Sequence, residues 1–229
     1  MMYVLHIANK NYSSWSLRPW LLLTQLRIPF EECLHPFSPG SNHDAFMAFS
    51  PTGKVPCLHE GEARIWDSLA IVEYLAERHE GVWPKDGAAR AWARCAAAEM
   101  HSGFGALREQ CAMSCGIRVA IDAPSAALLA DIARLDALWC EGLQRFGGPF
   151  LAGASFTAVD AFYAPVVFRA QTYGLSLSPP AEDYAARMLG LAGMQQWYAA
   201  AVSEPLREPA HDAECLRYGH LEADLRVPA

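Results

Sequence analysis

Three short segments in the first third of the chain hold the side chains and backbone groups best suited to chemistry. They are YSSWSLRPW at 12–20, SPTGKVPCL at 50–58 and IWDSLAIVEYL at 65–75. Each falls where a helix or a strand is expected to begin, and backbone groups at such ends lack partners inside the element. A ligand can bind at these positions, although each segment also has an ordinary structural explanation.

The first segment places hydroxyl groups at the start of an expected helix. Apolar residues recur at helical spacing from Trp15 to about Leu26, and Ser13 or Ser14 stands at the N-cap. A serine there can donate to a thiol beside the helix N-terminus; for cysteine, such surroundings lower the pKa from about 8.5 to roughly 3.5–7.5. Tyr12 offers a third hydroxyl. The alternative is a plain helix cap.

The second segment contains a proline in a strand-like run. Pro56 cannot donate to a strand ladder, so it does not fit the middle of a strand. A cis peptide bond before Pro56 at the start of the strand would turn the backbone of Val55 outward, where it can pair with an extended peptide. An ordinary turn before an edge strand explains the segment equally well.

The third segment places an acidic residue and a serine at the head of an amphipathic helix, where backbone N–H groups favour an anion. Ser68 can hydrogen-bond a ligand carboxylate while Asp67 accepts from an ammonium group. A γ-glutamyl group carries both charges on one carbon atom. The alternative is again a simple N-cap.

The elements that must position these segments change type often. Four short runs are expected strands: residues 3–8, 30–35, 55–59 and 63–66. Helices are expected from Trp15 to about Leu26 and over SLAIVEYLAERH at 68–79. The order is β-α-β, a long loop, then β-β-α, as in an α/β domain. The turn-rich link EGVWPKDG at 80–87 marks a domain boundary.

Beyond this link the pattern predicts a helix bundle and no strand. Ala, Leu, Met and aromatic residues recur at helical spacing in four stretches, residues 88–114, 124–146, 157–174 and 182–203. Thr157 and Asp160 form a capping box, which is a folding role. The tail from about Pro205 is expected to wrap the surface.

Composition excludes several classes of function. The 229-residue chain is 52% hydrophobic and carries a net charge of −7 without a Lys/Arg cluster, which argues against nucleic acid as a partner. No apolar run approaches the roughly 20 residues that span a bilayer, and the N-terminus does not resemble a signal peptide. A soluble protein of the cytoplasm, with no membrane partner, is expected.

The seven cysteines indicate free thiols. Their number is odd and no C-x-x-C pair occurs. Cys111 and Cys115 lie one helical turn apart, downstream of His101, but a metal site needs more ligands at closer spacing. No metal is therefore expected.

Taken together and in this order, the three segments resemble the cytosolic glutathione transferase superfamily along almost the whole chain. The resemblance implies a thioredoxin-like N-terminal domain (β-α-β-α-β-β-α) over residues 1–80 and an all-α helix-bundle domain over residues 88–229. It also implies a homodimer, with glutathione as co-substrate and a role in detoxification.

The resemblance assigns residues to glutathione. Val55-Pro56 matches the family's cis-proline position, which gives a backbone pair to the cysteinyl part of glutathione. Asp67-Ser68 matches the acidic-Ser pair of an E-S-x-A-I pattern. Lys54 matches a position that contacts the glycine carboxylate or backbone of glutathione.

A catalytic serine in the first loop, as in the zeta, theta, tau and phi classes, is also implied. It would activate the glutathione thiolate for attack on a hydrophobic electrophile. The tandem Ser13-Ser14 followed by Arg18 resembles the zeta-class start and favours Ser13. The spacing between the serine and the arginine in theta or phi members favours Ser14 instead. Neither serine position nor Trp15 carries a cysteine, unlike omega members.

The electrophile is expected between the first loop and the helix at 88–114, at the domain interface. Side chains one to two turns apart there are candidates to line its site: Met100, Phe104, Leu107, Arg108 and Cys111. An apolar wall with one arginine suits a hydrophobic electrophile with an anionic end. Ordinary core packing is an equal alternative for each residue.

Two other functions stay open. One is isomerisation of the maleylacetoacetate type, known in the zeta class; here the zeta cysteine is absent, and Arg169 lies two or three positions early for the substrate arginine. The other is a non-catalytic interaction module of the same fold. Such modules often lose the serine or the acidic-Ser pair, and this chain retains both.

Overall fold

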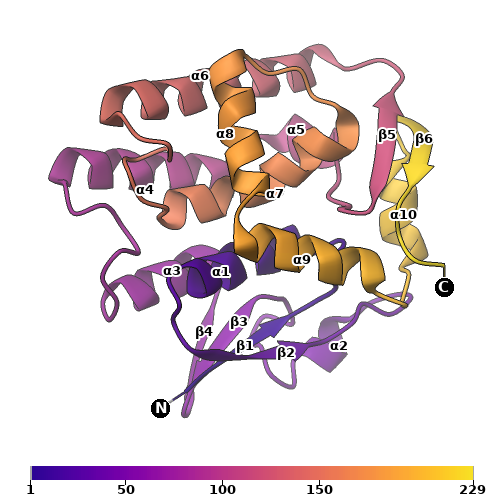
Figure 1. Ribbon diagram of the computed structural model, residues 1–229. Helices are drawn as coiled ribbons and strands as arrows, with labels where there is room; N and C mark the ends of the chain where they lie inside the picture. Colours follow the sequence, from indigo (N-terminus) through magenta and orange to yellow (C-terminus); the bar gives the residue numbers. More distant parts are fainter. Residues whose placement is uncertain (1, 229) are drawn as a thin grey trace.

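A four-stranded mixed sheet, with two longer helices on one face and a short helix on the other, forms the N-terminal part of the computed structural model, which describes residues 2–228 (Figure 1). Its elements are β1 (Tyr3–Ile7), α1 (Ser14–Gln25), β2 (Phe30–Leu34), α2 (His43–Phe46), β3 (Cys57–Glu60), β4 (Ala63–Trp66) and α3 (Ser68–Ala76). The strand order is β2-β1-β3-β4, with β1 parallel to β2 and antiparallel to β3. The predicted thioredoxin-like order is confirmed.

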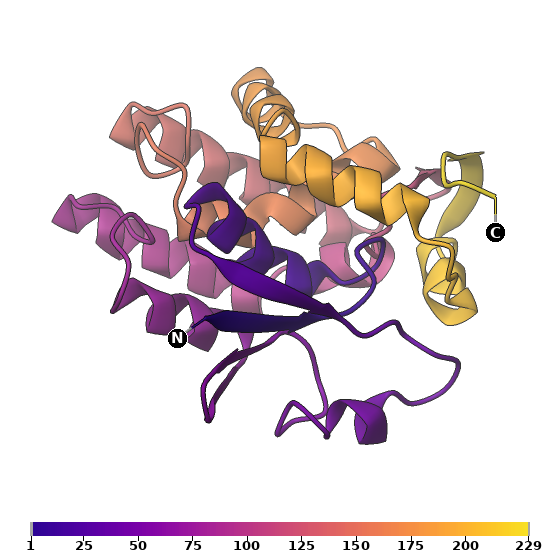
Figure 2. The same cartoon turned by 60° about the horizontal axis from the view of Figure 1, so that its bottom comes forward.

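The two faces of this sheet differ in composition. Leu5 and Ile7 of β1 are fully buried in the main core that α1 and α3 cover. Because side chains alternate along a strand, His6 lies on the opposite face. There the loop with α2 packs through Phe46 and Phe49, and Figure 2 shows this loop on the side of the sheet away from the helical layer.

The C-terminal part is mainly helical, as predicted. It contains α4 (Gly87–Ser102), α5 (Gly105–Gln110), α6 (Ala126–Phe146), α7 (Ala158–Tyr173), α8 (Pro179–Leu189), α9 (Ala192–Ser203) and α10 (Pro209–Cys215). Helix α7 is buried along nearly its whole length and packs against α1 and α4. The Thr157/Asp160 capping box at its head is confirmed, and Asp160 also accepts from the Tyr184 hydroxyl.

Two details of the helical prediction are wrong. The continuous helix expected over residues 88–114 ends at Ser102, because Phe104 takes a left-handed conformation (φ 55°) and α5 starts afresh. Two strands, β5 (Ile117–Ile121) and β6 (Gly219–Asp224), also pair antiparallel in the part expected to be all helical. Their partners lie about a hundred residues apart in sequence, so no local hairpin pattern revealed them.

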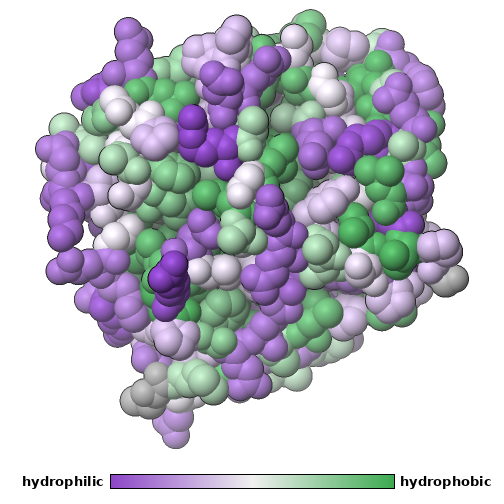
Figure 3. Space-filling view, viewed as in Figure 1, coloured by the Kyte–Doolittle hydropathy of each residue, from purple (hydrophilic) through white to green (hydrophobic). Residues whose placement is uncertain are grey.

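On the face drawn in Figure 3, hydrophilic and hydrophobic residues are interspersed over both parts of the molecule. Within residues 2–228, none of the helices combines the length and the apolar character needed to cross a bilayer.

Candidate functional site

Two adjoining cavities of about 400 and 430 Å³ open where the first loop, the Val55-Pro56 loop and the head of α3 meet. Trp15, Lys54 and Val55 line both of them. The first cavity also contains Ser13 and Ser14. The second is completed by Thr52, Pro56, Trp66, Asp67 and Ser68. The structure therefore brings all the predicted glutathione-binding residues and both serines to one composite site.

The Val55-Pro56 peptide bond is cis, as predicted. Pairing of β3 with β1 and β4 begins at Cys57, so Val55 lies outside the strand ladder and at the wall of both cavities. Gly53 has a φ of +61°, and a Cβ placed there would come within 2.3 Å of His43 Nδ1. Only glycine fits this position, which brings His43 and Lys54 to the rim of the first cavity.

The head of α3 carries a hydroxyl that lacks a partner. Asp67 is the N-cap, as predicted, and its Oδ1 accepts from Leu69 N at 2.8 Å, while Oδ2 lies 3.7 Å from His101 Nε2. Ser68 is 1% exposed, and its Oγ has no hydrogen-bond partner among residues 2–228. A buried hydroxyl without a partner is unfavourable, so this atom marks a place where a ligand acceptor fits.

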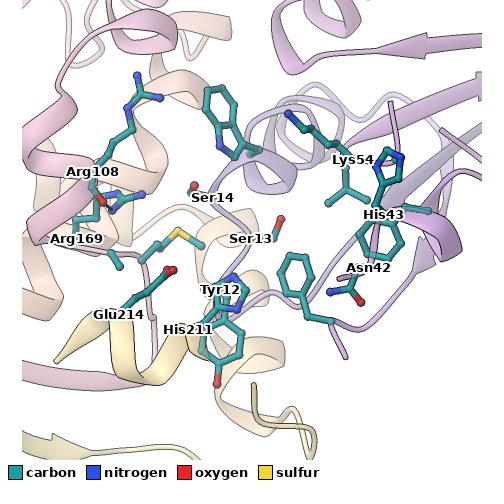
Figure 4. Close-up of a pocket in the computed structure, with 17 residues that line it drawn as sticks. Tyr12, Ser13, Ser14, Asn42, His43, Lys54, Arg108, Arg169, His211 and Glu214 are labelled. Carbon is teal, nitrogen blue, oxygen red and sulfur yellow. Dashed lines mark hydrogen bonds between the residues drawn. The ribbon is translucent and has the colours of Figure 1, made fainter. Parts of the chain in front are cut away.

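Ser13 is the N-cap of α1 and is 6% exposed. Its hydroxyl donates to Ser16 Oγ at 2.7 Å, and Ser16 Oγ also accepts from Ala8 N at 3.3 Å. Ser14 begins the helix and is half-buried. Figure 4 shows both serines in the middle of the first cavity, between two arginines on one side and Lys54 and His43 on the other.

Tyr12 lines the first cavity but turns its hydroxyl away from the two serines (Figure 4). That hydroxyl donates to Asp212 Oδ1 at 3.0 Å and accepts from Arg226 Nη1 at 3.2 Å. Burial raises the pKa of Tyr12. The Tyr12 hydroxyl therefore serves to tie the first loop to the C-terminal segment and is not directed at a thiol in the cavity.

One side of the first cavity is cationic. Arg108 and Arg169 line it, and both guanidinium groups also donate to main-chain carbonyls, those of Gly103 and Cys111 respectively. Arg18 lies beneath Trp15, with its Cζ 4.0 Å from the ring centroid. Burial, together with the charges of the other two arginines, lowers the pKa of Arg18 to about 9.

Of the five side chains expected to line the electrophile site, the structure places only Arg108 at a cavity wall. The other four are core residues with at most 6% exposure: Met100, Phe104, Leu107 and Cys111. Helix α4 packs on α7 and α5 packs on α6, so these side chains belong to the core. Burial raises the pKa of the Cys111 thiol to about 12, so that thiol is unreactive at neutral pH.

Several lining residues were missed in the sequence. In the first cavity they are Trp15, Phe37, Asn42, His43, Phe46, Ala112, Met113, Arg169, His211 and Glu214, and in the second Thr52 and Trp66. Trp15 and Trp66 could have been inferred, because they lie next to the predicted site residues in the sequence. His211 and Glu214 come from α10, and no local pattern connects them with the first loop.

Comparisons with known proteins agree with this geometry. Residues 12–78 match the family model described as glutathione S-transferase, N-terminal domain. The chain is 27% identical over 216 residues to glutathione S-transferase GstB of Escherichia coli (strain K12), a match that covers 86% of this chain and 92% of that protein.

Solved structures share the fold over most of both chains. A diazinon-metabolizing glutathione S-transferase of the silkworm Bombyx mori superposes with a TM-score of 0.69 at 16% identity, covering 88% of this chain and 97% of that one. A theta-class enzyme of Xanthomonas axonopodis pv. citri, with glutathione bound, gives 0.64 at 21% identity, covering 86% and 96%. Residues 12–78 therefore match a glutathione S-transferase N-terminal domain, and most of the chain is similar in sequence or in fold to glutathione S-transferases.

Proposed function

We propose that this protein is a serine-type glutathione transferase, with glutathione lying across both cavities and the electrophile in the first. The observation that carries the proposal is one juxtaposition: the cis Val55-Pro56 backbone, the unpaired Ser68 hydroxyl and Ser13 border adjoining cavities. We assign the glutathione-binding domain to residues 1–80 and the helical domain to residues 88–229, and we expect a homodimer.

Each part of glutathione has a matching group in this arrangement. The Ser68 hydroxyl donates to the γ-glutamyl carboxylate, and Asp67, whose Oδ2 lies 3.7 Å from His101 Nε2, accepts from the ammonium group. The Val55 backbone pairs with the cysteinyl residue as an added strand does. Lys54, which borders both cavities, pairs with the glycine carboxylate.

Ser13 is the proposed thiol-activating residue. Its proton is directed at Ser16 Oγ, but the Ser16 hydroxyl has a proton of its own. If Ser16 donates to Ser13 instead, the Ser13 proton becomes free to donate to the glutathione sulfur. Each unit by which such a bond lowers the thiol pKa corresponds to about 1.4 kcal/mol. Ser16 is then a positioning residue.

The preferred electrophile is hydrophobic and carries an anionic group. Its apolar part lies against Phe37, Phe46 and Met113, and its anionic end against Arg108 and Arg169. This pair of arginines also favours the second candidate function, isomerisation of a diketo dicarboxylate of the maleylacetoacetate type, since such a substrate presents two carboxylates. In either reaction the sulfur of glutathione attacks the substrate.

Calorimetry with glutathione, paired with conjugation of chlorodinitrobenzene, tests the proposal. Wild type and Ser13→Ala are expected to bind glutathione, with turnover lost in the variant; the Asp67→Ala/Ser68→Ala double variant is expected not to bind. If Ser14→Ala loses turnover while Ser13→Ala keeps it, the catalytic assignment moves to Ser14. If wild type does not bind glutathione at millimolar concentration, the transferase is ruled out in favour of an interaction module.

The electrophile class has a separate test. Chlorodinitrobenzoate, which adds a carboxylate to chlorodinitrobenzene, is expected to have a higher kcat/KM than its uncharged analogue. Arg108→Met should remove this preference, whereas the surface control Arg145→Met should keep it. Equal kcat/KM for the two substrates in wild type would refute the anionic preference. Rapid isomerisation of maleylacetoacetate by the same samples would favour the second candidate.

A further inference from the structure

Histidine and cysteine side chains gather on the sheet face that α2 covers, away from both cavities. Cys33 of β2 is the register partner of His6 of β1, and paired residues point to the same face. His35 lies two residues beyond Cys33, so it returns to that face, and its N–H continues the ladder to Ile7 O at 2.8 Å. His59 of β3 pairs with Val4, two residues before His6, and joins them there.

Three of these residues lie at metal-binding distance. One ligand atom from each of His6, Cys33 and His35 lies within 4.8 Å of the other two, and His6 Nδ1 is 2.8 Å from His35 Nε2. The Phe49 ring stacks on both imidazoles, with centroid distances of 4.6 Å to His6 and 4.0 Å to His35. His6 is buried, and the other two are half-buried, which leaves access from solvent.

A chain of hydrogen bonds fixes which nitrogen of His6 is free. Phe49 O can only accept, so His59 Nε2, 2.7 Å away, carries the proton and donates. His59 Nδ1 then holds a lone pair and accepts from His6 Nε2 at 3.3 Å. In the neutral ring His6 Nδ1 is consequently unprotonated, and its lone pair faces His35 Nε2.

This arrangement is the one that metal-ligating histidines show. Such a histidine binds the ion through one nitrogen and donates its other N–H to a partner that is itself held in place. His59, held by the Phe49 carbonyl, is that partner for His6.

We propose that His6, Cys33 and His35 bind a divalent transition-metal ion, zinc in the first instance, through two imidazole nitrogens and a thiolate. Tetrahedral zinc sets ligand atoms about 3.3–3.6 Å apart. The His6–His35 pair therefore opens by about half an ångström and Cys33 closes in. The His35 proton moves from Nε2 to Nδ1, and the Cys33 thiol releases its proton, so one proton leaves for each ion bound. The fourth position is open to water or an external ligand.

Titration of the chelator-treated protein with Co²⁺, in the absence of glutathione, tests this site. One equivalent is expected to bind, with a thiolate-to-cobalt charge-transfer band and the visible bands of tetrahedral cobalt; Zn²⁺ should displace it. Cys33→Ser should lose the charge-transfer band, and His35→Gln should weaken binding. The matched controls, Cys95→Ser and His220→Gln at exposed positions, should behave as wild type.

His59 supplies an independent test of positioning. His59→Phe leaves His6 Nε2 without an acceptor and should weaken cobalt binding about 10–100-fold, while His59→Gln, which can still accept from His6, should retain most of the affinity. Circular dichroism checks that each variant is folded. The proposal is overturned if wild type shows no charge-transfer band, or if folded Cys33→Ser binds cobalt as wild type does. Neither result depends on glutathione binding, since none of the three ligands lines a glutathione cavity.

Discussion

The two walls of the candidate site are built in different ways. The wall that runs from Lys54 to Ser68 comes from one continuous stretch, in which the β3–β4 hairpin leads directly into α3. The opposite wall, the first loop from Asn9 to Ser14, is held by residues far away in the sequence. Local structure thus forms the surface proposed to recognise glutathione, whereas tertiary contacts place the serine proposed to do chemistry.

A single buried carboxylate organises the first loop. Glu204 Oε1 accepts from Lys10 N at 2.5 Å, and its Oε2 accepts from Asn11 N at 3.3 Å and Asn9 Nδ2 at 3.4 Å. Trp197 Nε1 donates to Lys10 O at 2.8 Å. The helical part therefore controls the conformation of the loop, and residues far from any ligand can alter the position of Ser13.

The largest effect is expected at the serine itself. Ser13→Ala removes a hydrogen bond to a charged sulfur, a bond worth about 1.5–3 kcal/mol, and should lower kcat for chlorodinitrobenzene about 10–100-fold. Glutathione affinity, measured by calorimetry, should change little because recognition belongs to the other wall. A matching loss of affinity would show that the two walls do not divide the work in this way.

Glu204→Gln should weaken the first loop from a distance. The amide replaces one acceptor oxygen by a donor that faces buried N–H groups, which costs about 1–3 kcal/mol. Urea denaturation should show this loss of stability, together with a lower kcat. Glu222→Gln, on the exposed strand β6, is the control and should leave both unchanged. Wild-type stability in Glu204→Gln would mean that the Glu204 carboxylate does not hold the loop.

On the wall from Lys54 to Ser68, Ser68→Ala should change glutathione affinity without lowering the stability of the protein. Its hydroxyl has no protein partner within the described residues, so its removal should leave the unfolding free energy unchanged or slightly higher. Glutathione affinity should fall about tenfold, since a hydrogen bond to the carboxylate is lost. Calorimetry and urea denaturation of the same sample give both values. A drop in stability without a change in affinity would contradict the assignment.

The smallest effect is expected from Ser16→Ala. Ser13 keeps its hydroxyl but loses the neighbour that orients it, which corresponds to about 1 kcal/mol, or roughly fivefold in kcat. The pH profile of turnover should shift toward higher pH in this variant, since the thiolate is less stabilised. An unchanged profile would mean that Ser16 only packs beneath the loop.

Sequence reasoning succeeded where structure is local. The N-terminal element order, the cis bond at Val55-Pro56 and the N-cap at Asp67 follow from neighbours within a few residues, and the structure confirms each. The catalytic and glutathione-binding roles remain predictions, although the residues lie together.

The errors share a different cause. Met100 and Phe104 were placed in a cavity because helical spacing puts them on one face, but spacing does not tell which neighbour covers that face. Contacts between distant segments determine the pairing of β5 with β6. They also determine the position of His211 at the first cavity. Patterns confined to a dozen residues do not contain this information.

Because the first loop contacts residues far away in the sequence, the parts of the site also form in a fixed order on the ribosome. Every element of the wall from Lys54 to Ser68 has been synthesised when the chain reaches Ala76. The hydrogen-bond partners of the Tyr12 hydroxyl, Asp212 and Arg226, are synthesised much later. At about 5–20 residues per second, synthesis from Ala76 to Arg226 takes roughly 7 to 30 seconds. During that interval the nascent chain already carries the residues proposed to bind glutathione, while the loop with Ser13 lacks the contacts that fix it. Translation thus completes the wall proposed to recognise glutathione before it fixes the loop that holds the proposed catalytic serine.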